Sequence, residues 1–181
     1  MANAWTPIVA PIAVALLLVG AAGAGRSLAS TQGTVPRTSE LDRARQRLEG
    51  SFELEEWKVG GTVLRPPQVE GRFSVHDGLV MIMTVRKDLP VPETAAGYGT
   101  YRFENDTFTY GYTHHETVRA DADGKPSRRV SGPMTFPLRL EWQGDLLLVI
   151  GQGADRREYL PDGFSSPLGN TGDYRRWKRL E

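Results

Sequence analysis

From Gly50 to the end of the chain, the side chains alternate between apolar and polar in stretches rich in Val, Thr, Tyr, Phe and Leu. A period of two residues is typical of β-strands that bury one face. Turn sequences separate these stretches at Gly60-Gly61, Asp77-Gly78, Asn105-Asp106, Asp123-Gly124, Gly144 and Asp162-Gly163. This pattern predicts an all-β domain of about eight antiparallel strands joined by tight hairpins.

A meander of this kind has two edge strands, whose backbone groups need partners. Closure into an up-and-down β-barrel removes both edges and leaves an interior that holds one small ligand. A β-sandwich is the alternative. The chain has 181 residues, enough for one substantial core, so we expect a single domain.

The composition excludes several classes of function. Lys and Arg together number 22 and Asp and Glu also number 22, so we expect no nucleic-acid partner. The chain contains no cysteine, which excludes disulfides, Cys-ligated zinc and thiol nucleophiles. It also lacks a P-loop, a nucleophile elbow and a Gly-rich dinucleotide motif, and we expect no cofactor and no metal.

The N-terminus predicts export. The run from Ile8 to Gly25 carries no charge, and small residues at Ala22–Ala24 and Ser27–Ala29 match signal-peptidase sites. We therefore expect a signal peptide over residues 1–29, a mature N-terminus at Gly25 or Ser30, and a periplasmic or secreted protein. An uncleaved membrane anchor is the alternative, since an apolar run of 18 residues is at the short end of a bilayer span.

Residues 30–38 are small, polar or proline and predict a disordered linker before a barrel domain over residues 39–181. Ser39 with Asp42 can cap a short helix, in which Leu41, Ala44 and Leu48 recur at helical spacing. That helix is either a lid across one end of the barrel or a structural lead-in.

The stretch "TYGYTHHETV" over residues 109–118 holds two of the three histidines. A hairpin turn at Asn105-Asp106 pairs the strands on either side of it, and alternation then divides their side chains between two faces. The inward face of this hairpin is predicted to carry the ligand-binding residues Tyr101, Phe103, Phe108, Tyr110, Tyr112 and His114.

The adjacent histidines are therefore predicted to point to opposite faces, with His114 inside and His115 outside, so that they cannot share a metal. An inward His114, with Glu116 on the same face and Tyr110 nearby, makes these three residues weak candidates for acid/base catalysis. The more ordinary interpretation is a histidine that hydrogen-bonds a tyrosine, a water or the polar end of a ligand.

In two other hairpins the alternation does not decide which face is exposed. Met81 and Met83 lie either outward against another element or along the pocket, and we expect them to be packed in the core. Arg139 is expected on the surface, although an inward Arg139 would suit a carboxylate ligand.

Five segments in order, "LEGSFELEEWKV", "VEGRFSVHDGLVMIMTV", "AAGYGTYRFENDTFTYGYTHHETV", "LEWQGDLLLVI" and "DYRRWKRLE", resemble the strands of the bacterial and fungal lipocalin-like domain family. The resemblance covers Leu48 to Glu181. It implies a lipocalin-type barrel around a cavity, without a shared catalytic motif. Such domains tend to carry Gly-x-Trp on the first strand, where this chain has Gly50-Ser51-Phe52; Phe52 can still close the barrel floor, with Arg179 stacked across it.

Three classes of function follow. The aromatic inward face and the export signal favour a protein that binds a small hydrophobic or amphiphilic molecule inside the barrel. An isomerase or hydrolase acting on such a molecule is the first alternative, and a structural envelope barrel filled by its own side chains is the second.

Overall fold

The computed structural model describes residues 37–181, so the expected signal peptide and residues 30–36 of the expected linker lie outside the described part of the chain. One helix precedes twelve strands. The elements are α1 (Arg37–Leu48), β1 (Gly50–Val59), β2 (Thr62–Leu64), β3 (Val69–His76), β4 (Leu79–Arg86), β5 (Glu93–Glu104), β6 (Thr107–Ala120), β7 (Pro126–Ser131), β8 (Met134–Gln143), β9 (Leu146–Ile150), β10 (Arg156–Leu160), β11 (Gly163–Pro167) and β12 (Tyr174–Leu180).

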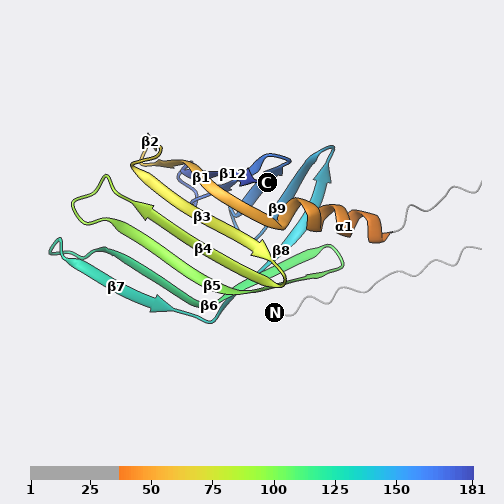
Figure 1. Ribbon diagram of the computed structural model, residues 1–181, viewed down its shortest axis with the longest axis horizontal. Helices are drawn as coiled ribbons and strands as arrows, with labels where there is room; N and C mark the ends of the chain where they lie inside the picture. The colour runs from red at the N-terminus through yellow and green to blue at the C-terminus, as the bar shows by residue number, and fades with distance from the viewer. Residues whose placement is uncertain (1–36) are drawn as a thin grey trace, which may run out of the picture. The chain divides into compact units, whose positions relative to one another are not determined.

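Ten of these strands close into a barrel. Each strand pairs antiparallel with the next in the order β1, β3, β4, β5, β6, β8, β9, β10, β11 and β12, and β12 pairs with β1 to complete the ring (Figure 1). Strands β2 and β7 lie off the ring, on β1 and β6. The predicted all-β, up-and-down barrel is confirmed and the sandwich alternative is excluded.

The expected number of about eight strands is too low. Each of the six turn sequences lies in a hairpin, and Asp77, Gly78 and Asn105 have the positive φ angles that tight turns require. The remaining connections between strands contain none of these turn sequences. In addition, β9, β10 and β11 have only five residues each. Strands this short show little alternation, which is why the pattern undercounts them.

Helix α1 lies against one end of the barrel (Figure 1). It begins at Arg37, two residues before the predicted Ser39 cap, and it buries Ala44 and Leu48. Its position fits the predicted lid. This helix is not long and apolar enough to cross a membrane, and the part of the chain that the structure describes contains no other helix.

Arg179 joins the helix to the barrel floor. Its guanidinium lies 4.8 Å from the centre of the Phe52 ring, as predicted from the sequence. The same group donates hydrogen bonds to the backbone oxygens of Arg47 and Glu49, at 2.5 Å and 2.8 Å. Carbonyl groups at a helix C-terminus lack partners within the helix, so Arg179 satisfies them from the last strand.

Two groups of aromatic rings fill much of the interior. One lies beside Phe52 on the floor and consists of Phe52, Phe73, Tyr159, Phe164 and Trp177. The other follows the β5–β6 hairpin and β8 and consists of Tyr101, Phe103, Phe108, Tyr110, Tyr112 and Phe136. The predicted inward face of the hairpin is therefore aromatic, and most of its rings pack against one another.

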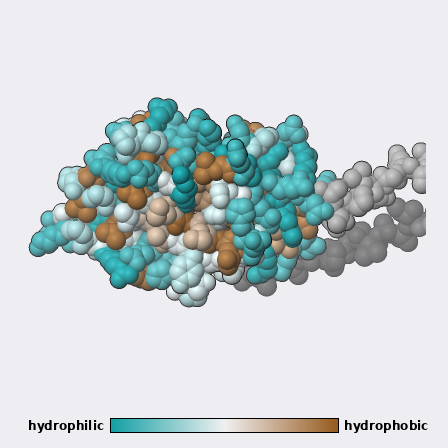
Figure 2. All heavy atoms as spheres, viewed as in Figure 1, coloured by the Kyte–Doolittle hydropathy of each residue, from teal (hydrophilic) through white to brown (hydrophobic). Residues whose placement is uncertain are grey.

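The outer face of β4 and β5 carries exposed apolar side chains. Met81 and Met83 are 55% and 51% exposed, so the expectation that they pack in the core is wrong. Figure 2 shows hydrophobic residues scattered between hydrophilic ones on the face that β3, β4 and β5 turn to the viewer in Figure 1. Arg139 is exposed and pairs with Glu141, which confirms its expected surface position.

Candidate functional site

The interior of the barrel contains a partly open cavity of about 210 Å³ between the two aromatic groups. Aromatic rings from four strands form its walls, and its polar groups come from β6, β10, β11 and β12. The lining residues are Phe73, Ile82, Tyr110, Tyr112, His115, Arg157, Phe164, Ser166, Pro167, Leu168, Arg175 and Trp177. A mostly apolar cavity with a few convergent polar groups is typical of a small-molecule site.

The predicted ligand-binding residues separate into two sets. Tyr110 and Tyr112 line the cavity. Tyr101, Phe103 and Phe108 also face inward, in the predicted register, but they pack near α1 and do not reach the cavity. The Tyr101 hydroxyl donates to the Glu49 carboxylate at 2.6 Å, and burial together with this carboxylate raises the pKa of Tyr101 to about 12.

The prediction that His114 faces the interior is wrong. The register is as predicted from Phe103–Phe108 to Gly99–Tyr112, but the next pair is Tyr98 with His114, so Thr113 is an extra residue in β6. A bulge of this kind shifts the alternation that follows it by one residue. His114 therefore stacks on the exposed Tyr98 on the outer face, and its side chain is 39% exposed.

His115 takes the inward place. It lines the cavity beside Tyr112, with ring centres 5.3 Å apart, and it lies opposite Gly97, where a Cβ atom would meet the imidazole. Burial, with the nearby charges of His114 and Arg175, lowers the pKa of His115. The two histidines do point to opposite faces, as expected, but with their sides exchanged.

The three weak catalytic candidates do not come together: His114 and Glu116 lie 3.8 Å apart on the outer face, and Tyr110 is not with them. Tyr110 is inside the barrel, whereas His114 and Glu116 are on the outer face, where Glu116 accepts a hydrogen bond from Arg128 at 2.6 Å. The Arg128 hydrogen bond and charge lower the pKa of Glu116, which is the behaviour of a surface ion pair. The pair of His114 and Glu116 therefore lies outside the barrel, away from the cavity that Tyr110 lines.

Arg157 lines the cavity, and its positive charge is balanced by a neighbouring carboxylate. Its guanidinium binds both carboxylate oxygens of Asp155 at 3.0 Å and donates to the Tyr110 hydroxyl at 2.8 Å. Desolvation alone would lower the pKa of Arg157, but Tyr110 and Asp155 raise it above its ordinary value. The bidentate pair fixes Arg157 and balances its charge.

Arg175 is the second cation of the wall, and its charge is not balanced in the same way. Its guanidinium lies 3.9 Å from the centre of the Trp57 ring. Within residues 37–181 it forms no ion pair, and its Nε atom is buried without a hydrogen-bond partner. Burial lowers the pKa of Arg175 to about 10 against the attraction of Glu93, so the side chain stays charged at neutral pH.

Four polar residues of this cavity were not predicted from the sequence: His115, Arg157, Ser166 and Arg175. A usable signal existed for Arg175, because period-two alternation from the inward Arg179 through Trp177 places it on the same face. No comparable signal exists for His115, since its position depends on the bulge. The sequence also gives no sign that Arg157 is buried, because that depends on the pairing of β10 with β9.

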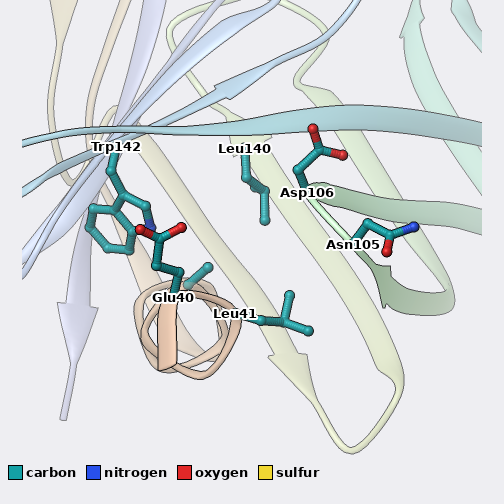
Figure 3. Close-up of a pocket in the computed structure, with 7 residues that line it drawn as sticks. Glu40, Leu41, Asn105, Asp106, Leu140 and Trp142 are labelled. Carbon is teal, nitrogen blue, oxygen red and sulfur yellow. The ribbon is translucent and has the colours of Figure 1, made fainter. Parts of the chain in front are cut away.

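A larger groove of about 400 Å³ lies at the helix end of the barrel, between α1, the β5–β6 turn and β8. Figure 3 shows Leu41 and Leu140 pointing toward this groove, with Glu40 beside Trp142 and with Asn105 and Asp106 at the far edge. Its charged groups are carboxylates on exposed elements. None of the aromatic residues predicted to bind a ligand reaches it, so the interior cavity is the candidate site.

No family model matches the chain, and no curated protein or solved structure matches it either.

Proposed function

We propose that this protein is an exported, lipocalin-like barrel that binds a small lipophilic or aromatic molecule in its interior. The observation that carries this proposal is the cavity of about 210 Å³ inside a closed barrel, with Tyr112, Phe164 and Trp177 in its walls. An apolar cavity of about 150 Å³ is large enough to bind benzene, so this one accommodates a single ring with substituents.

Export is supported by the sequence, through the uncharged segment Ile8–Gly25 and the small residues that follow its centre. The lipocalin-like assignment is supported by the order of the strand segments and by Arg179 stacked on Phe52. N-terminal sequencing of the protein from its host checks the first point, with Gly25 or Ser30 as the expected first residue and Met1 in the membrane fraction as the contrary result.

The structural alternative requires a barrel filled by its own side chains. The aromatic groups do fill part of the interior, but the space between them, about 210 Å³, is larger than a few waters, each of which occupies about 30 Å³ in the liquid. The enzyme alternative loses its proposed acid/base residues, because Tyr110 is inside and His114 and Glu116 are outside. Binding is therefore the function that the geometry supports best.

A matched pair of serines in β11 tests the proposal. Ser166 lines the cavity, whereas its neighbour Ser165 lies on the opposite face of the strand. The neutral probe p-cresol is titrated into ¹⁵N-labelled protein. We expect shifts at amides around Tyr112 and Phe164 in the wild type and in Ser165→Phe, and none in Ser166→Phe, whose ring fills the cavity. Shifts that persist in Ser166→Phe would reject the interior site, as would a wild type that responds neither to p-cresol nor to the benzoate and benzamide used below.

A further inference from the structure

The charges around the cavity are unequal. None of the twelve residues that line it is acidic, while Arg157 and Arg175 both reach it. Asp155 binds Arg157 through two hydrogen bonds and balances that charge from behind the wall. No carboxylate in residues 37–181 lies within ion-pair distance of Arg175. Glu93 attracts Arg175 from beyond ion-pair distance, so in the described part of the chain Arg175 is the cation of the cavity without a directly paired carboxylate.

Arg175 is held in place by apolar surroundings. Its guanidinium stacks on Trp57, and its backbone pairs with Ser166 across β11. The Nε atom is buried without a hydrogen-bond partner among the described residues. A buried, charged donor without a partner is costly, and a bound anion would remove that cost.

Three neutral donors face the same space. The Tyr112 hydroxyl stays protonated because burial raises the pKa of Tyr112. His115 is neutral at pH 7 because burial lowers the pKa of His115, and a neutral imidazole still donates one hydrogen bond. Ser166 adds a hydroxyl group on the strand next to Arg175. Donors grouped around one cation favour an acceptor with negative charge.

The apolar walls and the volume of the cavity determine the size and the apolar part of the ligand. Phe164 and Trp177 are stacked with ring centres 5.7 Å apart, and both line the cavity. The volume of about 210 Å³ admits one ring and one small polar group, and is too small to contain a whole long acyl chain. A planar carboxylate matches the fork of a guanidinium group better than other small anions of the same charge.

We propose that the ligand is a small aromatic monocarboxylate of about the size of benzoate, whose carboxylate binds Arg175 and whose ring lies against Phe164 and Trp177. This inference rests on the proposed binding function and specifies the chemical class of the ligand. It also assigns Arg175 as the residue that selects an anion over a neutral molecule of the same shape.

The test compares benzoate with benzamide, which has the same shape and no charge, by calorimetry and by amide shifts at pH 7. The variants are Arg175→Met, which removes the cation, and Arg176→Met, which removes the neighbouring arginine on the outer face. We expect benzoate to bind the wild type and Arg176→Met at least ~10-fold more tightly than benzamide, and Arg175→Met to lose that preference.

The outcomes separate the two proposals. Equal affinity of the wild type for benzoate and benzamide would overturn the carboxylate assignment and leave interior binding in place. No binding of benzoate, benzamide or p-cresol would reject both. If Arg175→Met does not fold, Arg175→Lys replaces it: a retained charge without the planar fork is expected to weaken benzoate binding and to leave benzamide binding unchanged, and unchanged benzoate binding would count against Arg175.

Discussion

At the scale of single residues, Thr113 decides which of two adjacent histidines reaches the interior. It is the extra residue between the Gly99–Tyr112 and Tyr98–His114 pairs. At the same point β6 changes partner, because Tyr112 pairs with Met134 in β8 and His115 pairs with Ser131 in β7. A bulge often marks the place where a strand changes its pairing, and here it also directs an imidazole into the cavity.

The imidazole of His115 is expected to titrate below pH 6.5, because burial and the charges of His114 and Arg175 disfavour its protonated form. NMR titration of the ring protons gives the midpoint. A midpoint at or above 6.5 would contradict the inward position of His115.

The same shift makes stability depend on pH. Above pH 6.5 His115 is neutral in both states and contributes nothing; as the pH falls below 6.5, the unfolded chain binds a proton before the folded chain does. The free energy of unfolding therefore decreases through this window and levels off below the folded pKa. Urea unfolding of His115→Gln should show a weaker decrease than the wild type, whereas His114→Gln on the outer face should keep it.

At the scale of elements, α1 is held on the barrel by a side chain from the last strand. We expect Arg179→Met to lower the free energy of unfolding by about 2–3 kcal/mol, because it removes charged hydrogen bonds to the last turn of the helix and the contact with Phe52. Lys178→Met, on the exposed face of β12, serves as the control, with a change within about 0.5 kcal/mol.

Amide hydrogen exchange distinguishes a helix effect from a general loss of stability. Exchange in α1 should rise more than exchange in the half of β5 away from the helix, at residues 93–97, because Arg179 bonds only the helix end of the barrel. Uniform acceleration over all strands, or unchanged stability, would show that Arg179 does not anchor the lid.

The elements also show where prediction from the sequence succeeds. Turn signals and alternation are local, so the register from Phe103–Phe108 to Gly99–Tyr112 follows directly from the Asn105-Asp106 turn. The bulge at Thr113 follows from pairing with two different strands, β7 and β8, which no local pattern encodes. For the same reason the sequence identifies two aromatic residues of the cavity, Tyr110 and Tyr112, and not its charged residues, whose positions depend on how distant strands meet.

At the scale of the whole barrel, closure depends on the pairing of β1 with β12. The pairs run from Ser51–Leu180 to Lys58–Tyr174 and join the beginning of the described chain to its end. Strand β12 also pairs with β11 and supplies the buried Trp177. The cavity wall, the helix anchor and the closure of the ring therefore all depend on one strand of seven residues.

Deletion of residues 174–181 is accordingly expected to abolish cooperative unfolding. Loss of a buried Trp side chain alone costs about 3–5 kcal/mol, and the deletion also leaves β1 and β11 as open edges. Native domains have only about 5–15 kcal/mol in total. Shortening the β6–β7 hairpin is the matched control, because β7 lies off the ring and is mostly exposed. Replacement of residues 119–127 by Asn-Gly, between the paired Val118 and Arg128, should change stability by no more than about 1 kcal/mol.

Urea unfolding followed by circular dichroism compares the two deletions. The hairpin variant should keep a single transition with a slope close to that of the wild type, since the slope follows the surface exposed on unfolding. The chain without β12 should show no transition, or a shallow one, because an open sheet of nine strands exposes the aromatic floor around Phe52 and Phe164 to water. A steep transition in that chain would mean that the two aromatic groups hold the remaining sheet together without closure, and that the cavity does not depend on the ring.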